Sequence, residues 1–142
     1  MAVTNVQFTV AAHIMAALAF RDGEETSSAL LAQSVNANPS FVRKSLSKLA
    51  KAGLVRTTRG KNGASQLARS PKRITLLDIY KASASGPAIT LHSYPARMAC
   101  PVSCNFKECM AAVLKGAQSS LEKSLAKTTL ASMVAGLHRS GR

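Results

Sequence analysis

The sequence predicts a mainly α-helical protein that carries one small β-hairpin. Apolar residues recur at helical spacing through most of the 142-residue chain. The stretch 54–69 differs, because two short runs rich in β-forming residues flank Asn62-Gly63, a dipeptide typical of a hairpin turn. The hydrophobic fraction of 46% excludes global disorder, and the length fits one small domain with an extension.

The positive charge of the chain is concentrated in one stretch. The chain contains nineteen Lys and Arg and only six Asp and Glu, which gives a formal net charge of +13. Residues 26–77 contain no acid and ten bases: Arg43, Lys44, Lys48, Lys51, Arg56, Arg59, Lys61, Arg69, Lys72 and Arg73. This pattern favours a polyanion, most simply nucleic acid, over a merely solvated basic surface. With four Phe, two Tyr and no Trp, neither aromatic membrane anchors nor base-stacking platforms for single strands are expected.

No segment has the composition of a membrane span or a signal peptide. The most apolar run, 8–20, is interrupted by His13 and is not preceded by Lys or Arg. Three cysteines are an odd number, which argues against a fully paired secreted framework within one chain. We therefore expect a cytoplasmic protein without a membrane partner.

Capping residues divide the first half of the chain into three helices. Thr4 and Asn5 precede a helix over 6–20, which is apolar on nearly every side and is expected to lie at the centre of the fold. Residues 26–28 cap a short helix that ends near Val35. Asn38 and Pro39 then begin a third helix, which runs to about Ala52 and stops at Gly53.

The third helix is predicted to have one aliphatic and one basic face. At about 100° per residue, Val42, Leu46 and Leu49 fall on one side. Polar and basic residues fall on the other: Ser40, Arg43, Lys44, Ser47, Lys48 and Lys51. Two helices joined by a tight turn, with a charged second helix, form the helix-turn-helix arrangement that enters the major groove of DNA. The alternative is an ordinary helical hairpin with a solvated face.

The hairpin completes a winged helix-turn-helix. Arg59 and Lys61 lie at its predicted tip, where arginine can enter the adjacent minor groove. Thr75 and Asp78 form a variant of the capping box and predict a helix over 76–82. Residues 1–82 are thus expected to form the DNA-binding domain.

The second half is predicted to carry dimerisation. Residues 83–99 form a linker, 100–137 a Cys-bearing segment with a long helix over 105–127, and 138–142 a basic tail. One apolar stripe follows the long helix: Phe106, Met110, Val113, Leu114, Ala117, Leu121 and Leu125. Such a stripe needs a partner surface, and a second copy of the chain is the simplest one, giving a homodimer.

Several motifs together resemble the winged-helix repressors of the Rrf family, whose relatives include the IscR, NsrR and CymR regulators. The resemblance covers nearly the whole chain and is most like the YwnA-type branch. The motifs are Ser40-Phe41-Val42-Arg43-Lys44, Ala52-Gly53-Leu54-Val55, Arg59-Gly60, Ile74-Thr75-Leu76-Leu77-Asp78-Ile79, Cys100-Pro101-Val102 and Thr129-Leu130-Ala131. The resemblance implies a homodimer that binds a palindromic operator, with Ser40, Arg43, Lys44 and Arg59 at the DNA-reading positions.

Three interpretations of the cysteines remain open. Cys100, Cys104 and Cys109 can form a thiol switch, since a helix start and neighbouring cations favour the reactive thiolate. They can instead hold an iron–sulfur cluster, as in IscR-like relatives, although the spacing is shorter and the His after the last Cys is missing. Buried, inert thiols are the third interpretation. No cofactor or other metal site is predicted.

The sequence thus predicts a dimeric DNA-binding transcriptional regulator, a repressor controlled by oxidation or electrophile modification of cysteines. One alternative is an iron–sulfur-sensing regulator of the same family. Another, from a different class, is a nonspecific nucleic-acid-binding protein. An enzyme is not expected, because a thiol oxidoreductase would want a Cys-x-x-Cys motif or a nearby His base.

Overall fold

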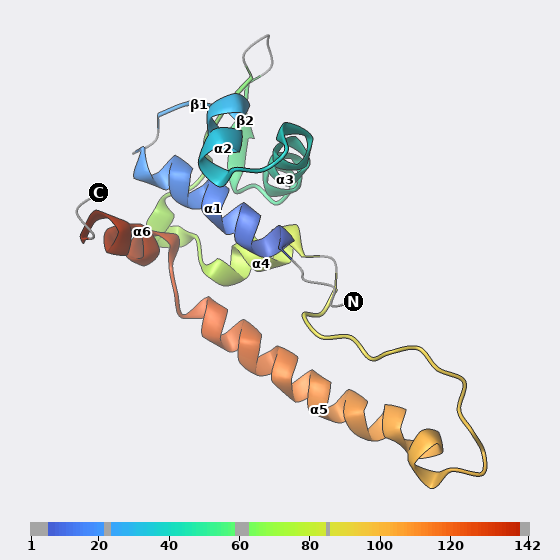
Figure 1. The fold of residues 1–142 in the computed structure, drawn as a ribbon. Coiled ribbons are helices and arrows are strands. Elements are labelled where there is room, and N and C mark those ends of the chain that lie inside the picture. Colours follow the sequence, from blue (N-terminus) through green and yellow to red (C-terminus); the bar gives the residue numbers. More distant parts are fainter. Residues whose placement is uncertain (1–5, 22–23, 59–62, 85, 140–142) are drawn as a thin grey trace.

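The computed structural model describes residues 6–21, 24–58, 63–84 and 86–139. Helices dominate these residues, with three short strands between them (Figure 1). The elements are α1 (Gln7–Phe20), β1 (Thr26–Ser27), α2 (Ser28–Val35), α3 (Pro39–Lys51), β2 (Val55–Thr57), β3 (Ala64–Leu67), the 3-10 turn η1 (Pro71–Arg73), α4 (Leu76–Ser83), α5 (Pro101–Ala126) and α6 (Leu130–Arg139). The predicted fold class is confirmed.

Helix α1 forms the centre of the molecule because it is apolar on nearly every side. Ala11, Ile14, Met15 and Leu18 are completely buried. Helices α2, α3, α4 and α6 and strand β3 all pack against α1. The predicted caps of this helix, residues 4–5, lie outside the described residues.

The wing is a three-stranded antiparallel sheet in the order β1-β3-β2. Strands β2 and β3 form the predicted hairpin, with Val55 opposite Leu67. Strand β1 pairs with the other edge of β3, where Thr26 lies opposite Ser65. The sequence did not predict β1, since two residues are too few to show an alternating pattern.

A short backbone pairing connects the two halves of the chain. The N–H of Leu76 donates to the carbonyl of Thr128 at 2.9 Å, and the N–H of Leu130 donates to the carbonyl of Ile74 at 2.8 Å. The side chains of Ile74 and Leu130 are completely buried. Helix α6 is thereby held against α1, and α5 leaves the winged domain from a fixed point.

Helix α4 starts where the sequence predicts. The Thr75 hydroxyl accepts from the N–H of Asp78 at 3.1 Å, and the Asp78 carboxylate accepts from the N–H of Thr75 at 3.0 Å. This reciprocal capping box satisfies two donors at the helix start.

Helix α5 leads away from the other helices, with its cysteine-bearing N-terminus at the far end (Figure 1). It begins at Pro101, four residues before the predicted start, because Cys100 caps it and proline is favoured in the first turn. Among the described residues of 84–100 there is neither helix nor strand, as expected of the linker. This segment runs from α4 out to the N-terminus of α5.

The predicted apolar stripe on α5 is covered only in part by the same chain. Met110, Leu114, Leu121 and Leu125 are half-buried, whereas Phe106, Val113 and Ala117 are exposed. The residues of the predicted stripe span an arc of about 120° at 100° per residue, and in the described chain only one side of this arc is covered.

The C-terminal helix α6 ends at Arg139, so it continues past the predicted boundary between residues 137 and 138. Residues 140–142 of the predicted tail lie outside the described residues. Within the part of the chain that the structure describes, no helix is both long and apolar enough to cross a membrane.

The buried pairing predicts that Leu130 is critical for stability. Leu130→Ala should lower the free energy of unfolding by about 2–5 kcal/mol, because it leaves a cavity beside α1 and Ile74. On the same helix Leu137 is 43% exposed, and Leu137→Ala should cost only about 0.5 kcal/mol. Urea unfolding measures both, and equal losses would contradict the role given to Leu130.

Candidate nucleic-acid interface

Three short-range caps fix the ends of α2 and the start of α3. The Ser27 hydroxyl accepts from the N–H of Leu30 at 3.2 Å and begins α2. Asn36 ends α2 in the left-handed conformation, with φ of 56°, which Asn adopts more readily than most residues. Asn38 Oδ1 then accepts from the N–H of Ser40 at 2.8 Å and begins α3. The turn between the helices therefore comprises only residues 36–38.

Helix α3 separates its apolar and polar residues as predicted. Val42 and Leu49 are completely buried, and Leu46 is nearly so. Five predicted site residues share the exposed part of the helix: Ser40, Arg43, Lys44, Ser47 and Lys48. The structure thus brings these five together on one open surface, and Arg43 Nη2 donates to Ser40 Oγ at 3.2 Å.

The remaining predicted DNA-contacting residues, Arg59 and Lys61, lie outside the described residues. Two other cations extend the surface, namely Lys51 at the end of α3 and Arg56 on β2, and both are exposed. The sequence places Lys51 on the basic side of the third helix and Arg56 in the basic stretch, and it assigns neither residue to DNA contact. Gly53, with φ of 77°, turns the chain from α3 into β2, so the helix surface and the wing are adjacent.

The cations of α3 are not neutralised within the chain. Among the described residues, none of Arg43, Lys44, Lys48 and Lys51 forms an ion pair with a carboxylate. Their positive charge is therefore available to an external polyanion.

A family model described as Rrf2, Iron-dependent Transcriptional regulator, matches residues 4–136. The chain belongs to this family. It is therefore a transcriptional regulator with a DNA-binding winged helix, and not an enzyme. The resemblance found in the sequence is confirmed.

Individual relatives agree with this family membership. The HTH-type transcriptional regulator YwnA of Bacillus subtilis (strain 168) is 33% identical over 127 residues, covering 89% of this chain and 92% of the relative. The crystal structure of a transcriptional regulator from Lactobacillus plantarum is 29% identical, with a TM-score of 0.77 over 96% of this chain and 92% of the other. T. potens IscR shares the fold at 22% identity, with a TM-score of 0.72 over 99% and 92% of the two chains.

The cysteines of the Rrf2-family chain occupy two sides of α5. Cys100 and Cys104 are half-buried, whereas Cys109 is exposed. Cys109 follows Cys104 by five residues, which places the two about 140° apart around the helix, and Cys100 caps the helix from outside it. The structure therefore does not bring the three predicted redox-sensing residues together.

An iron–sulfur cluster does not fit the thiols of a single chain. Among the described residues no group of three or more His, Cys, Asp or Glu side chains is arranged to hold a metal ion. Cys104 Sγ instead donates to the carbonyl of Arg97 at 3.1 Å, and Cys100 Sγ accepts from the N–H of Ser103 at 3.4 Å.

Proposed function

We propose that this Rrf2-family protein is a cytoplasmic homodimeric repressor, that it reads a palindromic operator through α3, and that oxidation of cysteines at the start of α5 controls it. The observation that carries the proposal is the exposed surface of α3, whose cations have no acidic partner among the described residues. This surface is carried by a helix-turn-helix whose turn is fixed by Asn36 and Asn38.

The placement of Arg43 and Ser40 supports direct reading of bases. Both residues lie in the N-terminal part of α3, which in helix-turn-helix proteins contacts base edges in the major groove. An arginine can bond two acceptors of guanine at once. Lys44, Ser47 and Lys48 lie along the same surface and are suited to phosphate contacts, which orient the protein without reading sequence.

The uncovered side of α5 supports a dimer. Val102 is 70% exposed, Val113 is 60% exposed and Phe106 is 37% exposed. Together with Cys109, Gly116 and Ser120, these apolar residues form a series in which the interval alternates between four and three residues. This is the spacing of a seam between two helices. We name residues 102, 106, 109, 113, 116 and 120 the α5 seam. Small residues in its second half allow two helices to approach closely, and a twofold dimer would place two reading helices on one duplex.

The first turn of α5 supports control by oxidation. Cys100 caps the helix and Cys104 lies one turn later, with its N–H donating to the carbonyl of Cys100 at 3.0 Å. Cβ atoms four residues apart on a helix are separated by about 5–6 Å, whereas a disulfide requires about 3.5–4.5 Å. A peroxide would oxidise one thiol to a sulfenic acid and release water, and the second thiol would then form the disulfide and release another water. That bond would distort the first turn.

The same turn holds the end of the linker. Ser103 Oγ accepts from the N–H of Arg97 at 2.9 Å, and the carbonyl of Ser103 accepts from the hydroxyl of Tyr94 at 2.8 Å. A disulfide would remove the Cys104 bond to Arg97 and the Cys100 cap, so oxidation would weaken the attachment of the linker to α5. Cys109, the third predicted redox-sensing thiol, belongs to the α5 seam and is not part of this turn.

Substitution of the reading surface tests DNA recognition. On an operator selected from random duplexes, Arg43→Ala should weaken binding by about 1–3 kcal/mol and relax the preference at one base pair. Lys48→Ala should weaken binding to the selected operator and to unrelated DNA by the same factor. The control is Lys107→Ala, an exposed lysine on α5, which should bind like the parent. Failure to select any consensus would favour the nonspecific nucleic-acid-binding alternative.

Substitution within the α5 seam tests the dimer. Val113→Asp should yield monomers in sedimentation equilibrium, because two carboxylates would be buried near the twofold axis. Lys107→Asp changes the charge on another side of α5 and should leave the dimer intact. If Val113→Asp still sediments as a dimer, another surface joins the subunits.

Cysteine substitution tests control by oxidation. Protein purified without oxygen should bind its operator, and peroxide should weaken that binding at least tenfold. Cys100→Ser and Cys104→Ser should each abolish this response, whereas Cys109→Ser should respond like the parent. If Cys109→Ser alone abolishes the response, a disulfide between subunits replaces the bond within the turn. If the protein retains iron that Cys109→Ser loses, the iron–sulfur alternative replaces the thiol switch.

A further inference from the structure

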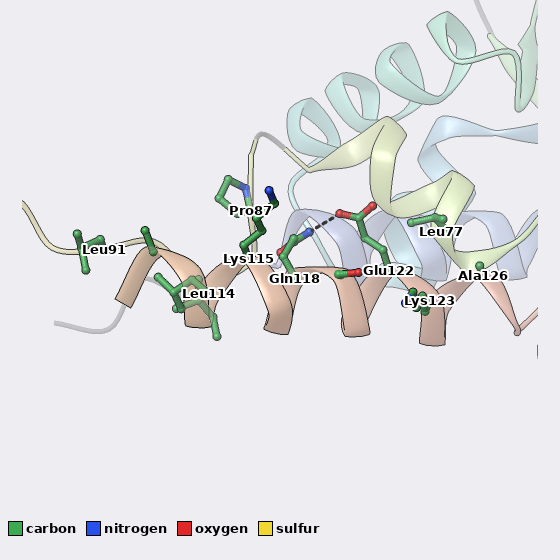
Figure 2. A pocket seen from close by; sticks show the side chains of 12 residues that line it. Leu77, Pro87, Leu91, Leu114, Lys115, Gln118, Glu122, Lys123 and Ala126 are labelled. Atoms are coloured by element: carbon green, nitrogen blue, oxygen red, sulfur yellow. Dashed lines mark hydrogen bonds between the residues drawn. The ribbon is translucent and has the colours of Figure 1, made fainter. Parts of the chain in front are cut away.

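A cavity of about 680 Å³ lies between the linker, α4 and α5 (Figure 2). Its apolar wall is aliphatic and includes Leu77 of α4, Ile89 and Leu91 of the linker and Leu114 of α5. The volume falls within the ~300–1,000 Å³ of sites that bind small molecules, which are mostly apolar with a few polar groups. Neither the DNA-reading surface nor the cysteine turn contributes to this cavity.

The polar lining of the cavity carries a net positive charge. Lys115 and Lys123 both line it, and neither forms an ion pair among the described residues. Glu122 is the one acid in the lining, and its carboxylate accepts from Gln118 Nε2 at 3.0 Å. Two ammonium groups beside an aliphatic wall match a molecule that has an apolar body and a carboxylate.

Gln118 joins three parts of the molecule at the edge of the cavity. Its Oε1 accepts from the N–H of Ala88 in the linker at 3.0 Å. Its Nε2 donates to the hydroxyl of Tyr80 on α4 at 3.1 Å, and to Glu122 on α5. Since the cavity borders this junction, a molecule inside it would contact the linker and α5 at the point where they are joined.

Most of the α5 residues that line the cavity lie on a different side of the helix from the seam, whereas Lys123 follows Gly116 by seven residues and lies at the edge of the seam. Lys115 follows Phe106 by nine residues, and Glu122 follows Val113 by nine, so each pair is about 180° apart around the helix. A dimer formed through the α5 seam would therefore leave this side of the helix open.

We propose that this cavity is a binding site for an organic anion with an aliphatic body, such as a medium-chain carboxylate. Lys115 and Lys123, about 12 Å apart along α5, attract the carboxylate, and the aliphatic wall holds the chain. Occupation adds contacts between the linker and α5 beside the Gln118 junction and thereby changes the affinity for the operator. The binding itself is independent of the proposed function, whereas its consequence for the operator rests on it.

Titration calorimetry on the full-length dimer tests the binding without DNA. Decanoate should bind once per chain, and decanol and decylamine should each bind at least tenfold more weakly. The double substitution Lys115→Gln with Lys123→Gln should weaken the binding of decanoate at least tenfold. Ser119→Trp should abolish its binding by filling the cavity. Lys107→Gln removes a charge from α5 outside the cavity and should leave the affinity unchanged.

The outcomes separate this site from the proposed function. Absence of decanoate binding, or equal binding of the three probes, would overturn the site even if the protein reads its operator normally. Loss of the dimer on Ser119→Trp would also overturn it, because a second subunit would then occupy the cavity. If decanoate binds as expected but operator affinity changes less than twofold at saturation, the regulatory part of the proposal is wrong.

Discussion

The arrangement of the whole molecule depends on a few backbone hydrogen bonds between the segment before α4 and the segment after α5. These bonds place Leu130 beside Ile74 and set the point at which α5 leaves the winged domain. This pairing joins two segments that are more than fifty residues apart in the sequence. Because their backbone N–H and carbonyl groups are hydrogen-bonded to each other, the junction can be buried without leaving polar groups unpaired. The position of every residue of α5 relative to α3 follows from it.

Helix α5 is attached to its own chain at three levels along its length. Its C-terminal end is held by this pairing, its middle by Gln118, and its first turn by the contacts of Ser103 with Tyr94 and Arg97. The attachments near both ends are made by segments that lead directly to the winged domain. A chemical change at either place therefore acts on the position of α3 through covalent connection as well as packing.

Local sequence signals predicted the helices of the winged domain well. Asn38 with Pro39, and Thr75 with Asp78, determine helix starts through bonds within a few residues, so sequence alone sufficed to locate α3 and α4. Strand β1 was missed because its partner β3 is distant in sequence. The two sides of α5 could not be separated from periodicity, since the spacing of apolar residues does not say which side the same chain will cover. The separation of Cys109 from Cys104 was missed for a related reason: the helix starts earlier than predicted, so both residues follow its rotation, while Cys100 caps it.

The length of α5 has a mechanical consequence. Its 26 residues span about 39 Å at 1.5 Å per residue. A rotation of only 5° about its attached C-terminal end would displace the far end by roughly 3 Å, close to the rise of one base pair. Angular changes too small to disturb the core thus become large displacements at the cysteine-bearing end of the helix.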